Sequence, residues 1–405
     1  MRPEFHFTAS GWINDPHGVT YADGRYHLFF QYVPGSTSWD LGCYWGHASG
    51  HDLFSLHELA PALAPGDGDD GIWSGAVMVA DDGLPRIFYT SISAGEPAIG
   101  RIRIAYAEDP DWLHWKKGPV VATAPTGTGV TAFRDPVVTA DGSGWRMLVG
   151  AGFANGAAGA VGYSSGDGET WSEGSTVIAR LGDEVDPVWS GSIWECPQII
   201  EVDGQHALLL SVWNEDVLHD VLYALGSYEE GVFSPRTWGR LSFGPSPYAA
   251  TAFRDQQDRS CVMFWLRGIS GDGWTGAHSV PYVVAIDGDQ LSLSPHPDLD
   301  RYHDETAVTG TAADMSWSDH ARTTMRILGR DTEILVLDKI GTDLHIRVDG
   351  AEYTLPWEGD IRIILDGPIL EVSSRAGVFA CPIDPLQGDW HLEGADIKVR
   401  GLRKQ

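Results

Sequence analysis

The chain repeats one pattern of polar and apolar positions at a nearly constant spacing. Each repeat has a motif with a polar or acidic residue, a short apolar stretch, a tight turn, usually Asp-Gly, and a second aromatic or β-branched stretch. Five repeats are centred on Asp15, Ser74, Asp135, Glu195 and Ala252, which are 59, 61, 60 and 57 residues apart. A period that steady indicates a repeat architecture.

Each repeat is long enough for four antiparallel strands, which matches one blade of a β-propeller. The sequence therefore predicts a five-bladed propeller over residues 1–295, with the first strand of each blade lining a central channel. Asp15, Asp135 and Glu195 would then occupy equivalent positions on three innermost strands and point into one pocket. Like charges placed together destabilise a fold unless function needs them, so this convergence predicts an active site.

The pattern changes beyond about residue 290. The segment SPHPDLDRYHDETAVTG is typical of a linker, and from residue 320 onward short strands alternate at close intervals. This spacing predicts a β-sandwich over residues 310–405 with a structural role. The fold class expected for the whole chain is all-β: a five-bladed β-propeller followed by a small C-terminal β-sandwich.

Composition narrows the partners. The 27 basic against 56 acidic side chains give a net charge of −29, which argues against nucleic acid or an anionic membrane and suits a small neutral substrate. No run of 18 apolar residues exists, and the first residues lack the apolar core of a signal peptide, so we expect a cytoplasmic protein. Four isolated cysteines predict free thiols. The oligomeric state stays open.

We expect no metal and no cofactor. The histidines are scattered and show no metal-ligand spacing. The acidic residues Asp67, Asp69 and Asp70 lie in a Pro/Gly-rich stretch at 60–72, but the distal glutamate and flanking helices of a calcium loop are missing. This stretch is expected to be a solvated loop.

Six short blocks resemble those of a known family. WINDPHG at 12–18, FQYVP at 30–34, WGH at 45–47, WSG at 73–75, FRDP at 133–136 and WECP at 194–197 are similar, in order and spacing, to glycoside hydrolase family 32. This is the β-fructofuranosidase family of invertases, inulinases and levanases. His17, Val33 and Trp73 depart from its usual residues, which bears on substrate preference more than on reaction type.

The resemblance implies residue roles. Asp15 would be the nucleophile, Glu195 the general acid/base, and Asp135 a transition-state stabiliser that holds fructose hydroxyls. Arg134 would keep the neighbouring Asp135 ionised. The residues that would line the fructose site are Asn14, Gln31, Trp39, Trp73, Ser74 and Arg134, with Tyr248 and Trp265 as further wall residues.

These residues suit cleavage of a fructofuranosidic bond, in which one carboxylate attacks the anomeric carbon and another protonates the leaving oxygen. The expected function is a retaining glycoside hydrolase that releases fructose from β-fructofuranosides such as sucrose and short fructo-oligosaccharides through a covalent intermediate. A fructosyltransferase, an inverting arabinan- or xylan-cleaving relative and a non-catalytic sugar-binding propeller are the alternatives. The WINDPHG and WECP blocks argue against the inverting relative. Linkage preference stays open.

Overall fold

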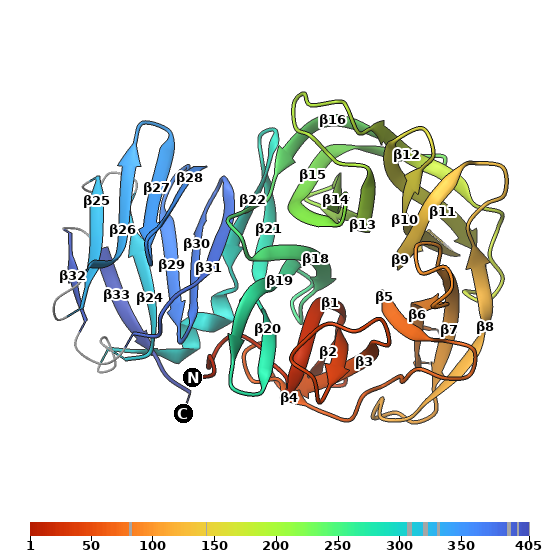
Figure 1. Cartoon of the computed structure of the whole chain (residues 1–405), viewed down its shortest axis with the longest axis horizontal. Helices are drawn as coiled ribbons and strands as arrows, with labels where there is room; N and C mark the ends of the chain where they lie inside the picture. The colour runs from red at the N-terminus through yellow and green to blue at the C-terminus, as the bar shows by residue number, and fades with distance from the viewer. Residues whose placement is uncertain are drawn as a thin grey trace.

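The protein is built almost entirely of β-strands (Figure 1). The computed structural model describes residues 1–80, 83–142, 144–305, 310–318, 323–329, 333–386, 390–394 and 397–404. Within these ranges the one helix is the 3-10 helix Pro297–Tyr302, and no helix is long and apolar enough to cross a membrane. All four cysteines are free and buried. The predicted all-β class is confirmed.

Three sheets of four strands each come from consecutive stretches of the chain. The first contains β5 Gly71–Val79, β6 Pro85–Ile92, β7 Arg101–Ala107 and β8 Trp115–Thr123. The second contains β9 Val130–Asp141, β10 Gly144–Phe153, β11 Ala157–Ser165 and β12 Ser175–Leu181. The third contains β13 Ile193–Val202, β14 Gln205–Asn214, β15 Val217–Glu229 and β16 Val232–Arg240. Each sheet is an antiparallel meander, as the repeat predicts.

A nine-stranded sheet joins the start of the chain to residues 247–295. Its members are β1 Gly11–Ala22, β2 Arg25–Pro34, β3 Tyr44–Gly50, β4 His57–Glu58, β18 Pro247–Arg254, β19 Ser260–Gly271, β20 Trp274–His278, β21 Tyr282–Asp287 and β22 Gln290–Pro295. The two parts meet where β1 pairs in parallel with β20, at Gly11 with Trp274 and Trp12 with Thr275. Backbone hydrogen bonds therefore close the arrangement between distant parts of the chain.

Two of the predicted Asp-Gly turns form hairpins, whereas the turn predicted at Asp141 includes residue 143, which lies outside the described residues. Asp203 and Gly204 have φ of 51° and 74°, and Asp23 and Gly24 have φ of 49° and 79°. Two consecutive positive φ values are what a type I′ hairpin turn requires. The turn predicted at Asp82 lies outside the described residues.

The first strands of the repeats surround a common axis. Each of β1, β5, β9 and β13 contacts the next, and β18, the fifth, contacts both β13 and β1. Figure 1 shows their sheets arranged around this centre, with the C-terminal region to one side. Apolar clusters fill the spaces between neighbouring sheets, for example Phe88 against Val149 and Leu148 against Leu210. The side chains at the start of these five strands are therefore brought together.

A β-bulge interrupts each of these five strands beside its motif. The extra residue lies between Ile13 and Pro16 in β1, between Trp73 and Gly75 in β5, and between Glu195 and Gln198 in β13. The corresponding irregularities in β9 and β18 lie at 134–137 and 248–251. A bulge re-aims the side chains beside it, and here it does so at one level of the channel. The fifth repeat is therefore centred near residue 249, not at Ala252 as the spacing predicted.

Two further sheets pack face to face as the C-terminal sandwich. One has the order β17-β31-β30-β29-β24-β33-β23 and the other β28-β27-β26-β25-β32. Their bounds are β17 Ser242–Phe243, β23 His303–Asp304, β24 Ala312–Trp317, β25 Thr324–Leu328, β26 Glu333–Ile340, β27 Asp343–Val348, β28 Ala351–Pro356, β29 Ile361–Asp366, β30 Ile369–Ser374, β31 Gly377–Pro382, β32 His391–Glu393 and β33 Ile397–Leu402. Met315, Trp317, Leu337 and Ile363 lie in the core between them.

The segment predicted as a linker, 294–310, is partly structured. It contains the end of β22, the 3-10 helix and β23, which pairs with β33. Residues 306–309 lie outside the described residues. A run of Pro, Asp and His can be compatible with ordered structure when its side chains find partners. Here His303 Nε2 contacts Asp314 Oδ2 at 2.7 Å.

The loop at 60–72 is not simply a solvated loop, because Asp69 is buried. Its Oδ1 accepts hydrogen bonds from Arg103 Nη1 at 2.8 Å and from Ser91 Oγ at 2.5 Å. Its Oδ2 accepts a hydrogen bond from Tyr89 Oη at 2.9 Å and lies 3.0 Å from Lys117 Nζ. The carboxylate thus ties the loop to β6, β7 and β8, a role that an acidic run in sequence does not reveal.

Candidate active site

The three predicted carboxylates meet in the channel, but their positions are not all equivalent. Asp15 and Asp135 each directly precede a proline, whereas Glu195 stands one residue earlier and Cys196 precedes Pro197. Cys196 therefore takes the position that the prediction gave to Glu195. Its N–H donates to Asp135 Oδ2 at 3.3 Å, and its Sγ lies 3.9 Å from Asp15 Oδ2. Asp135 and Cys196 have φ of 61° and 50°, which shows how the bulges turn the chain here.

Asp15 is held by two side chains. Ser74 Oγ donates to its Oδ2 at 2.7 Å, and Asn14 Nδ2 lies 3.3 Å from its Oδ1. Asn14 Nδ2 also donates to Gln31 Oε1, so β1, β2 and β5 fix this corner together. Burial and the charge of Glu195 raise the pKa of Asp15 to about 7, although the Ser74 hydrogen bond opposes the shift.

Glu195 receives one donor on each oxygen. Arg134 Nε donates to Oε1 at 2.8 Å, and Tyr248 Oη donates to Oε2 at 2.6 Å. Tyr248 is therefore more than the wall residue that was predicted. Arg134 on β9 pairs with Glu195 on the neighbouring strand β13 instead of with Asp135, which corrects the expected partner of this arginine.

Asp135 is buried without a salt bridge to Arg134. Burial first, and the charge of Glu195 second, raise its pKa well above the usual range, and the nearby charge of Arg134 does not offset them. Arg134 thus acts on the pKa of Asp135 in the expected direction, by lowering it, but burial and the charge of Glu195 outweigh its effect. The Asp135 N–H donates to Thr90 Oγ1 at 2.9 Å, and Thr90 Oγ1 donates to the carbonyl of Ser74 at 2.9 Å. Sequence reasoning missed Thr90, because a threonine inside a strand carries no distinguishing signal.

The predicted aromatic residues fall into two groups. Trp265 is buried between Tyr248 and Trp12, with ring centroids 6.4 and 6.0 Å away. Trp39 and Trp73 form an edge-to-face pair at 6.1 Å, in which Trp39 is 49% exposed and Trp73 Nε1 donates to the carbonyl of Leu41. The first group packs behind Glu195, and the second forms an accessible rim beside Ser74.

Two other residues of the WINDPHG motif serve the packing. Gly18 has φ of 58°, and a Cβ there would lie 2.5 Å from Val77 Cγ2, so glycine is required. His17 is buried at 4.2 Å from the Trp45 ring. Burial and the neighbouring His278 hold the pKa of His17 well below its usual range. His17 is thus a neutral side chain beneath the site.

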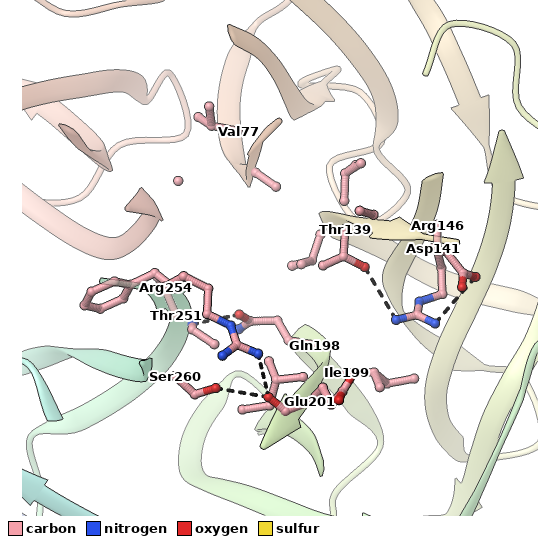
Figure 2. A pocket seen from close by; sticks show the side chains of 18 of the residues that line it. Val77, Thr139, Asp141, Arg146, Gln198, Ile199, Glu201, Thr251, Arg254 and Ser260 are labelled. Carbon is pink, nitrogen blue, oxygen red and sulfur yellow. Dashed lines mark hydrogen bonds and ion pairs between the residues drawn. The ribbon is translucent and has the colours of Figure 1, made fainter. Parts of the chain in front are cut away.

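A cavity of about 610 Å³ lies further along the same five strands. Figure 2 shows it lined by residues that follow the bulges, among them Val77, Gln198 and Thr251. None of the three carboxylates lines it. Gln198 bridges β13 and β18, because its Nε2 donates to the carbonyl of Ala250 at 2.6 Å and its Oε1 accepts from the N–H of Ala252 at 2.8 Å. The cavity therefore lies beyond the level of the three carboxylates.

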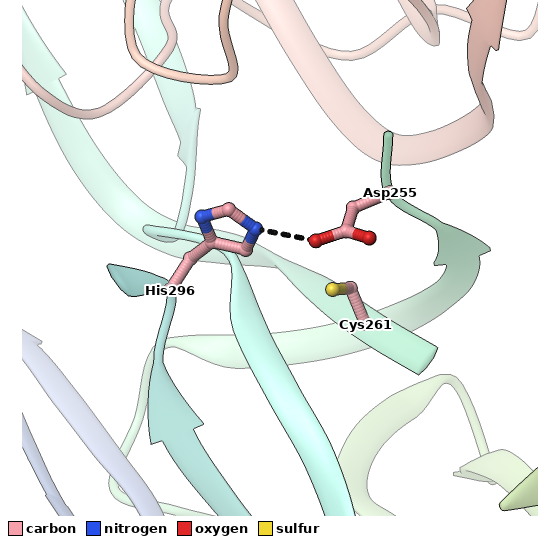
Figure 3. Close-up of side chains that lie close together, drawn as sticks. All are labelled: Asp255, Cys261 and His296. Carbon is pink, nitrogen blue, oxygen red and sulfur yellow. Dashed lines mark hydrogen bonds and ion pairs between the residues drawn. The ribbon is translucent and has the colours of Figure 1, made fainter. Parts of the chain in front are cut away.

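One buried group has the composition of a metal site, and Figure 3 shows it. Asp255, Cys261 and His296 lie together below the hairpin of β18 and β19. Asp255 Oδ2 already accepts a hydrogen bond from Arg259 Nε at 2.6 Å and contacts His296 Nε2 at 3.0 Å. Burial raises the pKa of Cys261 to about 12, so it remains a thiol. The carboxylate of Asp255 is thus already engaged by Arg259 and His296.

Comparison with known proteins identifies the family of the chain. The profile of the family described as "Glycosyl hydrolases family 32 N-terminal domain" matches residues 6–297. The chain is 32% identical over 346 residues to "Beta-fructofuranosidase, insoluble isoenzyme 7" of Oryza sativa subsp. indica, covering 74% of this chain and 56% of that protein. It is 30% identical over 319 residues to "Sucrose-6-phosphate hydrolase" of Zymomonas mobilis, covering 72% of this chain and 61% of that protein. The matches thus span little more than half the length of these relatives.

Solved structures share the fold. A Bombyx mori β-fructofuranosidase in complex with sucrose superposes with a TM-score of 0.86 at 21% identity, covering 100% of this chain and 94% of that one. A sucrose-6-phosphate hydrolase from Lactobacillus gasseri superposes with a TM-score of 0.83 at 20% identity, covering 99% and 93%. The family profile, which spans more than half of the chain, decides the assignment: this protein belongs to glycosyl hydrolase family 32.

Proposed function

We propose that this protein is a retaining β-fructofuranosidase that releases fructose from sucrose and short fructo-oligosaccharides. The observation that carries the proposal is the coupling of Asp15 and Glu195, whose charges interact in one buried network that Ser74, Arg134 and Tyr248 complete. Most glycosidases cleave the glycosidic bond with a pair of Asp or Glu carboxyl groups. The fructofuranosidase names of the relatives support fructosides as the substrate class.

In this proposal Asp15 is the nucleophile and Glu195 the general acid/base. Asp15 attacks the anomeric carbon of fructose while Glu195 gives its proton to the departing oxygen, which leaves as an alcohol. Glu195 then takes a proton from water, whose oxygen displaces Asp15 and releases fructose. The reaction starts with the proton on Glu195 and the charge on Asp15, so the two groups act as one proton-sharing pair.

Asp135 is proposed to hold fructose hydroxyls and thereby stabilise the transition state. It is buried beside the pair, and its Oδ2 receives only the long bond from the Cys196 N–H. We assign substrate contact to Asn14, Gln31, Trp39, Trp73, Ser74 and Arg134 as well, with Trp39 and Trp73 at the accessible rim. Tyr248 and Trp265 are proposed to shape the wall behind Glu195. A neutral saccharide suits a pocket whose near arginine is already paired with Glu195.

We further propose that the sheets of residues 1–295 form five blades and that residues 310–405 form the sandwich domain, to which β17 and β23 add strands from outside this range. The cyclic contacts of β1, β5, β9, β13 and β18 support five blades, as do their five bulges. In this interpretation the nine-stranded sheet is the first and fifth blades joined edge to edge through β1 and β20.

Fructose release from sucrose, 1-kestose, inulin, levan and an aryl arabinofuranoside tests the proposal. We expect fructose release from sucrose and 1-kestose. The rate of release should fall at least about 100-fold in folded Asp15→Asn, which lacks the nucleophile, and in folded Glu195→Gln, which lacks the acid/base. Longer oligosaccharides formed at high sucrose would identify a transferase. Release from the arabinofuranoside alone, or full activity in either variant, would refute the assignment.

A further inference from the structure

The second donor to Glu195 is itself supported by an arginine. Tyr248 is fully buried, and the guanidinium carbon of Arg267 lies 4.8 Å from the centroid of its ring. Arg267 comes from β19, the strand that pairs with β18, which carries Tyr248. A cation at this distance over an aromatic face is attracted by the ring electrons, more strongly where water is excluded. Arg267 therefore packs against the residue that contacts Glu195.

The surroundings of Arg267 fix its position without neutralising it. Its Nη1 donates to the carbonyl of Leu218 at 2.6 Å, its Nη2 to that of His219 at 3.1 Å, and its Nε to that of Ser246 at 3.4 Å. Among the described residues no carboxylate forms an ion pair with it. Each nitrogen of the guanidinium thus donates to a neutral carbonyl. The charge of Asp220 also acts on Arg267, but the ion pair of that carboxylate is with Arg240.

Two consequences follow for the Tyr248 hydroxyl. Stacking on one face of the ring, with Trp265 against it on another side, fixes the direction in which the hydroxyl points. The cation over the ring also draws electron density away from the phenol O–H, which strengthens the hydrogen bond that Tyr248 donates to a carboxylate. Both effects act on Glu195 Oε2, which lies 2.6 Å from the hydroxyl.

We propose that Arg267 is a positioning residue for the acid/base group, acting on Glu195 through Tyr248. The inference rests on the proposed function, because it assigns a role in the protonation step of that reaction. Arg267 touches neither the substrate position nor the carboxylates. It keeps Glu195 oriented toward the departing oxygen by holding the residue that binds the other side of the carboxyl group.

Leaving-group dependence separates this role from simple packing. A poor leaving group such as the glucose of sucrose needs a proton from Glu195, whereas an aryl leaving group departs without one. Because kcat/KM reports only the steps up to the first irreversible cleavage, it isolates this protonation. We expect Arg267→Gln to lower kcat/KM for sucrose by about 10-fold, a fraction of full acid catalysis. The value for a nitrophenyl β-fructofuranoside should change by less than about twofold.

A double variant tests the route through Tyr248. We expect Tyr248→Phe to show the same selective loss on sucrose, and Arg267→Gln to add almost nothing once Tyr248 is replaced, since residues that act in series are not additive. Arg267→Lys keeps the charge but not the planar stacking or the contacts with three carbonyls. Its sucrose-to-aryl ratio, which is kcat/KM for sucrose divided by kcat/KM for the nitrophenyl fructoside, should therefore lie between those of the wild type and Arg267→Gln.

Arg180 provides the matched control. Its guanidinium lies 5.1 Å from the Trp238 ring, it donates to the carbonyls of Val188 and Asp186, and it pairs with Glu184. Among the described residues it forms no hydrogen bond or ion pair with Asp15, Asp135 or Glu195. Arg180→Gln removes the same kind of interaction, and we expect a comparable loss of thermal stability with an unchanged sucrose-to-aryl ratio.

The outcomes are decisive in each direction. An unchanged ratio in folded Arg267→Gln, or in Arg267→Lys if the Gln variant does not fold, would overturn the inference. So would full additivity with Tyr248→Phe, or an equal shift of the ratio in Arg180→Gln. Wild-type protein that cleaves neither fructoside would instead contradict the proposed function, so the two failures can be told apart.

Discussion

At the scale of residues, the three carboxyl groups differ because their neighbours differ. Asp15 is held by a neutral hydroxyl and an amide, Glu195 by a guanidinium and a phenol, and Asp135 by backbone. The three carboxyl groups are chemically alike, but the hydrogen bonds that their oxygens accept differ, and this allows them to take separate roles. The raised pKa of Asp15 has a direct kinetic consequence, because Asp15 must be ionised while Glu195 keeps the proton that the pair shares.

The pH profile of kcat/KM for sucrose tests that consequence. Because a charged Glu195 helps to raise the pKa of Asp15 to about 7, this value marks the loss of the last proton from the pair, and kcat/KM should fall as pH rises through about 7. The Ser74 hydrogen bond lowers this pKa, so Ser74→Ala should move the fall to higher pH. Ser49→Ala, which removes a buried hydroxyl without a partner in β3, is the control. A profile that does not move in Ser74→Ala would contradict the account.

At the scale of elements, the buried carboxylate of Asp69 attaches the loop before β5 to the sheet that β5 belongs to. Asp69 receives hydrogen bonds or ion pairs from four side chains on β6, β7 and β8. The loop leads directly into Trp73 and Ser74, so its position bears on the rim of the site. The contacts of Asp69 therefore stabilise this sheet and also help to position Trp73 and Ser74, which are proposed to contact the substrate.

Removing this carboxylate should be costly. Asp69→Ala leaves Arg103 and Lys117 without their partner, and we expect a loss of about 3 kcal/mol in the free energy of unfolding, since breaking one side of a buried pair strands the other. Urea unfolding measures the change. Asp67→Asn, an exposed neighbour with φ of 54° that asparagine tolerates, should lie within about 0.5 kcal/mol of the wild type. Equal free energies of unfolding for Asp69→Ala and Asp67→Asn would show that the Asp69 contacts contribute nothing to stability.

The sequence predicted the strands and the convergence better than the connections between side chains. The repeat of motif, turn and strand follows from alternation and Asp-Gly signals, which are local. The bulges are not local, because an extra residue is defined only against its partner strand, so the fifth repeat was placed at Ala252. The reach of Arg134 to Glu195 and the burial of Asp69 also depend on strands that are distant in sequence. Such partners cannot be identified from one chain.

At the scale of the whole molecule, the N-terminal segment is bound to the sandwich through His6. We call the contact of His6 with Asp366 and Glu371 the clamp. His6 Nδ1 lies 2.8 Å from Asp366 Oδ2 in β29, and its Nε2 lies 2.9 Å from Glu371 Oε1 in β30. All three side chains are buried. Asp366 also accepts hydrogen bonds from the backbone N–H groups of residues 4–6. A doubly protonated imidazole satisfies both carboxylates, so this junction depends on pH.

The clamp predicts how stability changes with pH. Burial alone would lower the pKa of His6, but the charge of Glu371 and the bonds to both carboxylates raise it to about 9. Its contribution should therefore be fully present below about pH 6.5, the unfolded value, and be lost as pH rises through about 9. His6→Gln should destabilise the protein by about 3 kcal/mol at about pH 6 and by much less at about pH 10. The exposed His57→Gln serves as the control, and a His6→Gln effect that is equal at both pH values would exclude the clamp.

The most direct test of the central claim is to trap the intermediate on Asp15. Glu195→Gln, incubated with an aryl β-fructofuranoside whose leaving group needs no acid, should form the fructosyl ester quickly and hydrolyse it slowly, because the base is missing. Mass spectrometry of the peptide that contains Asp15 should then show one added fructosyl unit, absent from the Asp15→Asn variant. Turnover without this adduct, together with a first-formed product of inverted configuration at the anomeric carbon, would contradict the account.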